Sequence, residues 1–280
     1  MLKTILVCLD GTPNSEPVVR VALKLAHERQ ASLCGMIVVD KPAIEANEAT
    51  GIGGSSFKRL RNEHWLAETR ARAAEGLEAF ERRCRDHGVP ARVLEVIGAS
   101  LDSILAESER YDLTILGRGT RFHPTDKVAN KRVRDKILRQ ARRPFLVVPE
   151  SVVDSPNGQP ILVAYDGGKA STHALAGFIQ SGLADGREVH VATFGDDGYR
   201  AGDLAEEGAQ RLRAAGIRAF THGLVSALPT CEAIIDLGRK LNAGFLVMGG
   251  FAHSRFADFI HRSGTIHIVE HSTIPLCIQH

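Results

Sequence analysis

The chain has 280 residues, a formal net charge of +2, and a composition of 44% hydrophobic and 24% charged residues. Such a length predicts two domains of roughly 140 residues each rather than one. The near-neutral charge gives no general attraction to nucleic acid or to a membrane surface, and no apolar run approaches the roughly 20 residues of a bilayer span. We therefore expect neither nucleic acid nor membrane as a partner.

Cysteine usage and the first residues favour a cytoplasmic protein. The five cysteines are odd in number and scattered, and no Cys-x-x-Cys pair occurs. We expect buried, reduced thiols rather than disulfides or metal ligands. Met1–Asp10 lead directly into an apolar strand pattern, without the layout of a secretion signal.

Apolar runs and helical periodicities alternate along the chain. The first half has expected strands near residues 3–9, 32–39, 91–97, 112–117 and 144–148, and helices near 15–29, 58–87, 99–108 and 130–141. The second half has expected strands near 160–165, 187–194, 217–223, 244–249 and 275–279, and helices near 169–184, 201–214, 229–240 and 263–272. Alternation of this kind predicts a doubly wound, mainly parallel α/β sheet.

Two stretches lack a clear period. Lys41–Trp65 is rich in glycine, alanine, asparagine and serine, so we expect a long loop or flap there. Its Gly51–Ser56 run resembles a glycine-rich loop but lacks the strand–loop–helix arrangement of a phosphate loop, and is interpreted as mobile. The polar, turn-forming residues 151–159 are expected to link a first domain, 1–150, to a second, 160–280.

The sequence contains an internal repeat. Thr4–Thr12 and Pro160–Gly168 are both short apolar runs that end in Asp-Gly, at Asp10-Gly11 and Asp166-Gly167. A second apolar run in each half ends in glycine, at Gly117 and Gly249. Ligands of such sheets bind at the carboxyl ends of the strands, so these landmarks are where a site is expected.

The repeat resembles the universal stress protein family in its tandem two-domain form. The resemblance is carried by Ile5–Gly11, by Ile161–Gly167 and above all by Leu246–Arg255, which is close to the family segment VMGxxGHSR. It implies two Rossmann-like domains, each a five-stranded mainly parallel sheet flanked by helices. It also implies an adenine nucleotide as ligand, with the Asp of strand one facing the base and a glycine-rich G-x2-G-x9-G-[ST] segment cradling phosphates.

Neither half carries this glycine motif complete. In the second half Gly249 holds the first position, Ala252 the second and Arg262 the third, followed by Ser263. The motif of the first half begins at Gly117, but Lys131-Arg132 stand where Gly-[ST] belongs.

The second half is therefore the better candidate for ATP. There the resemblance implies contacts with the base, sugar and phosphates from Asp166, Gly167, Gly249, Gly250, Ala252, His253, Arg262 and Ser263. The weaker candidates of the first half are Asp10, Gly11, Gly117, Lys131 and Arg132.

Two groups of basic and histidine residues are further candidate sites. The basic cluster Lys127–Arg143 is interpreted as a solvated helix face. Histidines gather around the second motif, and His267 and His271 are four residues apart on one helix face. With no cysteine pair or carboxylate at fixed spacing, we interpret them as surface histidines and expect no metal.

The function that follows is a stress-response regulatory or binding protein, with ATP as a possible ligand. One alternative is a family member that binds no nucleotide and acts through protein contacts or another small ligand. A second is a weak ATP-hydrolysing enzyme, although no catalytic set is assembled in the sequence. In the family, last strands pair antiparallel between domains, so Phe145–Val148 and Leu276–Gln279 are expected to pair within one chain as an internal pseudo-dimer. Tandem chains could also form a homodimer.

Overall fold

The computed structural model describes residues 2–45, 55–122, 126–152, 158–184, 186–250 and 262–279. Contacts divide the chain into two compact units. The N-terminal unit is Lys3–Gln140, and the C-terminal unit is Ala141–His280 together with Met1–Leu2. The last strand of the first repeat is thus grouped with the second repeat.

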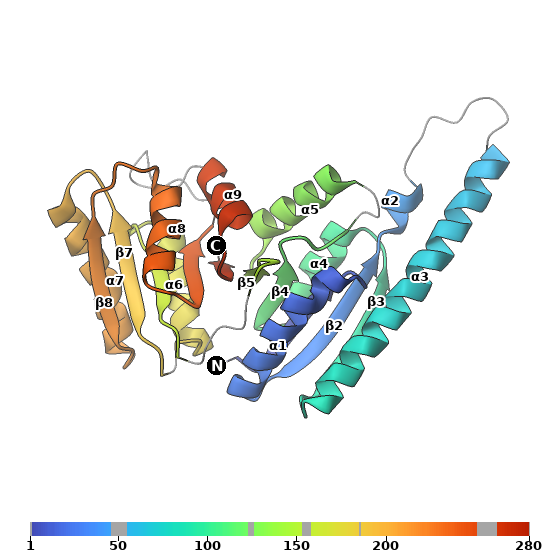
Figure 1. Cartoon of the computed structure of the whole chain (residues 1–280), viewed down its shortest axis with the longest axis horizontal. Helices are drawn as coiled ribbons and strands as arrows, with labels where there is room; N and C mark the ends of the chain where they lie inside the picture. Colours follow the sequence, from blue (N-terminus) through green and yellow to red (C-terminus); the bar gives the residue numbers. More distant parts are fainter. Residues whose placement is uncertain are drawn as a thin grey trace. The chain divides into compact units, whose positions relative to one another are not determined.

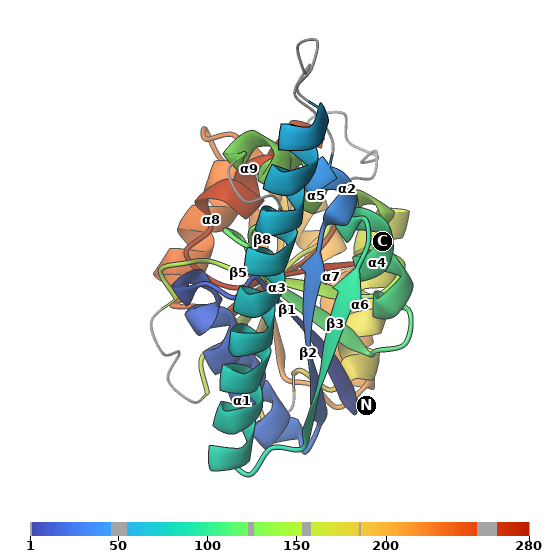
Figure 2. The same cartoon turned by 90° about the vertical axis from the view of Figure 1, so that its right-hand side faces the viewer.

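The N-terminal unit is a parallel sheet between helices (Figures 1 and 2). Its strands, in the order β3-β2-β1-β4, are β1 (Thr4–Leu9), β2 (Ser32–Val39), β3 (Ala91–Ile97) and β4 (Leu113–Gly117). A short 3-10 turn η1 (Pro13–Ser15) precedes the helices α1 (Glu16–Arg29), α2 (Lys41–Glu45), α3 (Ser55–Asp86), α4 (Ser100–Ser108) and α5 (Lys127–Gln140). Helices α1 and α3 cover one face of the sheet, and α4, with α5 beside it, covers the other.

The C-terminal unit repeats this arrangement and adds two strands, β10 and β5, at one edge of the sheet. Its strand order is β5-β10-β9-β6-β7-β8, formed by β5 (Phe145–Val148), β6 (Ile161–Ala164), β7 (Val189–Phe194), β8 (Ala219–Leu224), β9 (Phe245–Gly249) and β10 (Leu276–Gln279). The helices are α6 (Lys169–Ser181), α7 (Gly198–Ala214), α8 (Thr230–Lys240) and α9 (Arg262–His271). Pairing is parallel except between β5 and β10, where Leu276 lies opposite Val147 in an antiparallel ladder.

The fold class expected from the sequence is confirmed, and so is the antiparallel pairing of the two proline-led strands. Helices cover both faces of the sheet, so its central strands are apolar on both sides: Ile5, Leu6 and Val7 in β1 are all fully buried. Edge strand β3 instead alternates between exposed and half-buried residues. Helices and strands begin and end within a few residues of the expected positions.

The expected loop at Lys41–Trp65 is wrong at its start, where a short helix forms, and the helix expected near 58–87 begins a few residues earlier than expected. Lys41–Glu45 form α2, and α3 already begins at Ser55, while 46–54 lie outside the described residues. Asp40 caps α2 by accepting a hydrogen bond from the Ala43 N–H (3.0 Å). The early part of α3 carries an Arg59–Glu63 ion pair one turn apart (3.8 Å).

The basic cluster is also not a uniformly solvated face. Arg134 on α5 is only 2% exposed, and its guanidinium donates to the Asp135 carboxylate (2.8 Å) and to the Arg118 carbonyl oxygen (3.2 Å). A buried guanidinium needs such acceptors, because an unpaired buried charge is strongly destabilising. This arginine therefore holds the turn after β4 in place.

The cysteines of this chain are reduced thiols, and most of them lie in the core. All five cysteines are free, and four of them are buried. Burial raises the pKa of Cys8 and of Cys277 to about 12, so these thiols stay protonated and unreactive.

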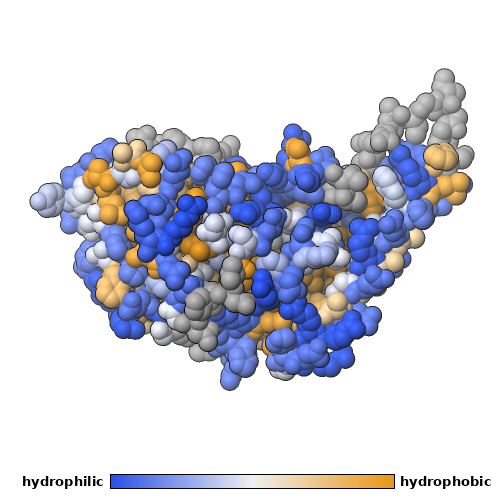
Figure 3. Space-filling view, in the orientation of Figure 1, coloured by the Kyte–Doolittle hydropathy of each residue, from blue (hydrophilic) through white to orange (hydrophobic). Residues whose placement is uncertain are grey.

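Over the described residues no helix is long and apolar enough to cross a bilayer. Hydrophobic side chains gather on the surface at the start of α3 (Figure 3).

Candidate functional site

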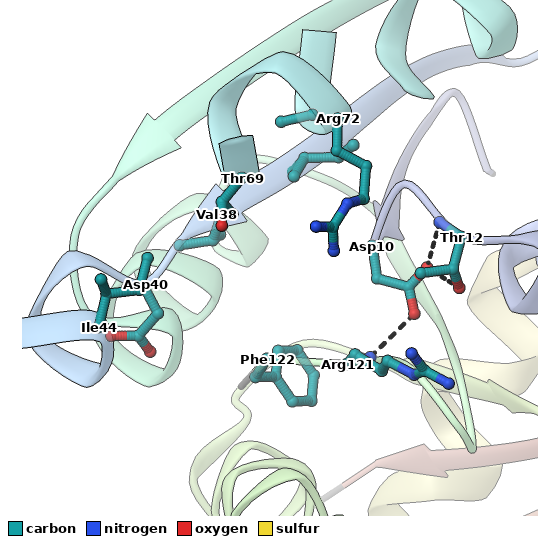
Figure 4. Close-up of a pocket in the computed structure, with 11 residues that line it drawn as sticks. Asp10, Thr12, Val38, Asp40, Ile44, Thr69, Arg72, Arg121 and Phe122 are labelled. Atoms are coloured by element: carbon teal, nitrogen blue, oxygen red, sulfur yellow. Dashed lines mark hydrogen bonds between the residues drawn. The ribbon is translucent and has the colours of Figure 1, made fainter. Parts of the chain in front are cut away.

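A cavity of about 50 Å³ lies in the N-terminal unit, at the carboxyl ends of β1 and β2 and beside the turn after β4 (Figure 4). Helix α3 and the short α2 enclose it from the sheet's outer side. Its lining residues come from five segments and are Asp10, Thr12, Ile37, Val38, Asp40, Ile44, Thr69, Arg72, Ala73, Arg121 and Phe122. This is the position at which a doubly wound sheet binds ligands.

The Asp10 carboxylate organises the turn after β1. Its Oδ1 accepts hydrogen bonds from the Thr12 N–H (2.9 Å), the Thr12 hydroxyl (2.7 Å) and the Ser15 hydroxyl (2.8 Å). Its Oδ2 accepts from the Arg121 backbone N–H (3.0 Å), which belongs to the turn after β4. Oδ1 therefore holds the turn after β1 together, and Oδ2 links this turn to the turn after β4 at the floor of the cavity.

Asp40 plays a similar part at the end of β2. Its Oδ1 accepts from the Ala43 N–H in α2, and its Oδ2 accepts from the Ser100 N–H at the start of α4 (2.9 Å). One carboxylate thus caps two helices. Negative charge at helix N-termini is favourable, so this carboxylate stabilises both helices.

The cationic groups at the cavity are arginines. Arg72 extends from α3 into the space beside Thr69 and Asp10 (Figure 4). Its guanidinium lies 3.3 Å from Glu68 and its side chain is 44% exposed, so the partner that the described part of the chain gives it is an exposed ion pair, which holds it weakly. Arg121 is exposed at the opposite rim, next to the buried ring of Phe122.

Among the candidate residues of the first half, only Asp10 lines this cavity. Gly11 is adjacent and has φ +67°, a conformation that glycine adopts without strain. It lies against the Arg72 carbonyl oxygen, where an added Cβ would be 3.0 Å away. Gly117 ends β4 and packs on Thr120. Lys131 and Arg132 belong to the exposed part of α5 and are not brought to the cavity.

A second, larger hollow of about 340 Å³ lies on the other side of the same turn, between α1 and α3. Its floor is mostly apolar, with Leu9, Val19 and Phe80, and an ion pair between Glu16 and Arg83 closes its rim. Gly11 therefore separates two hollows, and the arginine of the larger one, Arg83, is paired with Glu16.

The C-terminal unit positions Asp166 as the first half positions Asp10. Asp166 Oδ1 accepts from the Gly168 N–H (2.9 Å) and from the Ser171 hydroxyl. Gly167, with φ +70°, faces the Leu204 side chain of α7. Gly249 ends β9 against the backbone of α6, and the Gly250 N–H donates to the Gln279 carbonyl oxygen (3.2 Å).

The rest of the expected nucleotide motif cannot be placed with these residues. Ala252 and His253 lie outside the described residues. Arg262 and Ser263 are the first residues of α9, and the structure describes their backbone but not their side chains. His267 and His271 stack with ring centroids 4.1 Å apart, and His271 Nδ1 lies 2.9 Å from the His267 carbonyl oxygen of the same helix.

Sequence reasoning missed most of the cavity. Asp40 had a usable signal, since it follows a buried strand directly, as Asp10 does. Arg72 and Thr69 had none, because they lie on α3 some thirty residues beyond the strand end, behind a stretch that was interpreted as a loop. Arg121 and Phe122 lie in a turn whose local sequence matched no motif.

Comparison with known proteins places this fold and its turns in one family. The family model described as the universal stress protein family matches residues 1–149. The chain belongs to the universal stress protein family. Universal stress protein Slr1230 of Synechocystis sp. is 25% identical to it over 291 aligned residues, which cover 98% of this chain and 99% of the relative.

Solved structures show the same fold over the whole length of this universal stress protein. A universal stress protein of Archaeoglobus fulgidus matches with a TM-score of 0.74 and 20% identity, covering 99% of this chain and 95% of that one. A putative universal stress protein of Pseudomonas aeruginosa matches with a TM-score of 0.62 and 17% identity, covering 99% and 93%. Both likenesses extend the family fold beyond the residues that the family model matches.

Proposed function

We propose that this universal stress protein is a regulatory protein of the stress response that binds a small anionic ligand in the cavity of its N-terminal unit. A nucleotide such as ATP is the ligand that the sequence favours. The proposed site differs from the sequence expectation, which preferred the second half. Arg72 and Arg121 would hold the anion, while Asp10 and Asp40 keep the cavity in shape.

One observation carries this proposal. Both oxygens of Asp10 and both oxygens of Asp40 already accept hydrogen bonds from the protein's own N–H and hydroxyl groups. The acids are therefore committed to structure, and the cationic groups left to face a ligand are the guanidinium of Arg72 and the exposed Arg121. Guanidinium groups bind phosphate and carboxylate oxygens in a bidentate manner.

The size of the cavity favours a ligand smaller than a whole nucleotide unless a side chain moves. A drug-sized ligand needs about 300–1,000 Å³, whereas this cavity holds about 50 Å³. Arg72 is the side chain best able to move, since its one described partner, Glu68, is itself exposed. Its rotation toward solvent would open the space between α3 and the strand ends.

The test begins with denaturing freshly purified protein and identifying any released nucleotide by chromatography. Titration calorimetry with ATP and with inorganic phosphate then compares the wild type with Arg72→Ala. Arg82→Ala is the matched control, because Arg82 is an exposed arginine of the same helix and does not line the cavity. Asp166→Ala tests the second half.

We expect saturable binding of ATP or phosphate that weakens about tenfold in Arg72→Ala, as loss of one charge-assisted contact predicts, and stays unchanged in Arg82→Ala. Binding of phosphate but not ATP would identify a small-anion site. Binding that is lost in Asp166→Ala alone would place the ligand in the second half and overturn the proposed site. The absence of binding heat and of released nucleotide would overturn the ligand itself and leave a protein that acts through contacts with other proteins.

A further inference from the structure

Helix α3 has an apolar outer face that the ligand site does not explain. Its inner face is buried on the sheet through Ala73, Leu77 and Phe80. On the opposite side, exposed residues recur at alternating spacings of three and four. We call this row the outer seam, and its members are Phe57, Leu60, His64, Ala67, Ala71 and Ala74.

The seam has the spacing of a helix-pairing surface. Alternating steps of three and four give the 3.5-residue repeat that keeps one stripe of a helix facing a partner helix. Phe57 is 76% exposed and Leu60 is 60% exposed, which is unusual for large apolar side chains. Figure 2 shows α3 on the near side of the N-terminal unit, with β2 and β3 behind it. The seam thus points away from the sheet.

The seam is complementary to a reversed copy of itself. Its two large residues lie at the start of α3 and its three alanines farther along. When two such helices run antiparallel, with Ala67 next to the partner's Ala67, Leu60 lies over the partner's Ala74. Leu60 then meets a small side chain, and the alanines Ala67, Ala71 and Ala74 permit close approach of the two helices.

The charges that flank the seam favour the same orientation. On one flank are Glu63 and Arg70, and on the other are Arg61 and Glu75. The antiparallel arrangement places Glu63 opposite the partner's Arg70. It also places Arg61 opposite the partner's Glu75. The same register also sets Glu68 opposite the partner's Glu68, which is one like-charge contact against these attractive ones, and Arg70 pairs with Glu95 of its own chain as well (3.0 Å). A parallel arrangement would bring each Glu63 close to the partner's Glu68, where like charges are unfavourable.

We propose that the outer seam of α3 is a self-association surface, through which two copies of this chain pair antiparallel about a two-fold axis at Ala67. An isologous contact of this kind uses the same patch on both copies and closes into a dimer. The surface belongs wholly to the N-terminal unit and does not depend on the proposed ligand. Exposed flanking ion pairs contribute little energy, so they set orientation while the apolar seam supplies affinity.

The first experiment is sedimentation velocity of the full chain over a range of concentrations. The wild type is compared with Ala67→Glu, which puts two like charges on the axis. Ala79→Glu is the control, because Ala79 is an exposed alanine of α3 outside the seam. We expect a dimer whose dissociation constant rises at least about tenfold in Ala67→Glu and not in Ala79→Glu.

Cysteine cross-linking keeps the proposal testable if Ala67→Glu disturbs folding. In a Cys231→Ser background the remaining native thiols are buried. Ala67→Cys should then form an intermolecular disulfide under mild oxidation, whereas Ala74→Cys, which faces the partner's Leu60, should not. A monomeric wild type without Ala67→Cys cross-linking would overturn the proposal, as would a dimer indifferent to Ala67→Glu. Equal cross-linking at both positions would overturn the antiparallel orientation.

Discussion

The two Asp-Gly turns of this protein have the same local design and different neighbours. Asp10 and Asp166 each accept from an N–H two residues later and from a serine hydroxyl five residues later. Gly11 and Gly167 both have positive φ. Across the first turn lies Arg72 of α3, and across the second lies Leu204 of α7.

This difference shows where ligand chemistry enters the repeated fold. The turn itself is fixed by short-range hydrogen bonds and is retained in both halves. The helix that follows the second strand decides what faces the turn, and α3, with 32 residues, and α7, with 17, differ in length and in side chains. A cationic side chain beside the turn permits an anion site, and an aliphatic one fills the space instead.

The largest expected effect is a difference in stability between substitutions at Gly249 and at Gly117, the two glycines at the first position of the phosphate motif. A Cβ added at Gly249 would lie 2.5 Å from the Ala170 carbonyl carbon, and backbone cannot easily move aside. At Gly117 the nearest atoms are side-chain atoms of Thr120 (3.0 Å) and Val18 (3.1 Å). We expect Gly249→Ala to lower the free energy of unfolding by about 3 kcal/mol and Gly117→Ala by about 1 kcal/mol.

Urea unfolding followed by circular dichroism measures both variants. Equal losses would show that the close approach of β9 to α6 is not what requires glycine at the end of β9. If Gly249→Ala is tolerated, packing does not require this glycine, and phosphate binding becomes the better explanation for it.

A smaller effect is expected from removing the two carboxylates. Asp10→Ala loses the bonds within its own turn and also the bond to the Arg121 N–H, which joins two turns. We expect it to cost about 2 kcal/mol, and Asp166→Ala about 1 kcal/mol, since partly buried hydrogen bonds to charged groups contribute on this scale. Urea midpoints give the comparison, and Asp102→Ala, an exposed acid in α4, is the control. A larger loss of stability in Asp166→Ala than in Asp10→Ala would contradict the role of Asp10 in linking two turns.

The smallest effect concerns the second and third strands of the C-terminal unit, where His190 Nδ1 lies 2.8 Å from His222 Nε2. Burial lowers the pKa of both histidines from the ordinary 6.5, and their mutual charge lowers that of His222 further. The folded state therefore binds fewer protons than the unfolded state just below pH 6.5. Stability from this pair is fully present above that value and is lost as pH falls through the lowered pKa values.

We expect His222→Gln to flatten the fall of the urea midpoint between pH 7 and pH 5. The N-terminal unit is the internal reference, because its second and third strands pair Cys34 with Arg92 instead. An unchanged pH profile in the variant would show that the pair does not titrate between these limits.

Particular residues show how far the sequence could predict this molecule. The uniformly apolar β1 and β6 and the Asp-Gly repeats predict the doubly wound fold, because buried parallel strands permit little else. The helix near 58–87 was expected, but its first residues could not be predicted, since Phe57 faces outward and breaks the inward apolar pattern that marks a helix. Arg72 reaches Asp10 only through tertiary packing, which no local pattern encodes. Arg134 was interpreted as solvated because its buried acceptor, the Arg118 carbonyl, carries no sequence signal.

The central claim is that the N-terminal unit, through Arg72, holds the anion. Hydrogen–deuterium exchange with and without saturating ATP or inorganic phosphate tests it most directly. The account predicts slower exchange in peptides that cover the turns at 10–15 and 117–122 and the middle of α3, and no change at 166–171. Protection confined to 166–171 and the start of α9, with the turn of Asp10 unchanged, would contradict it.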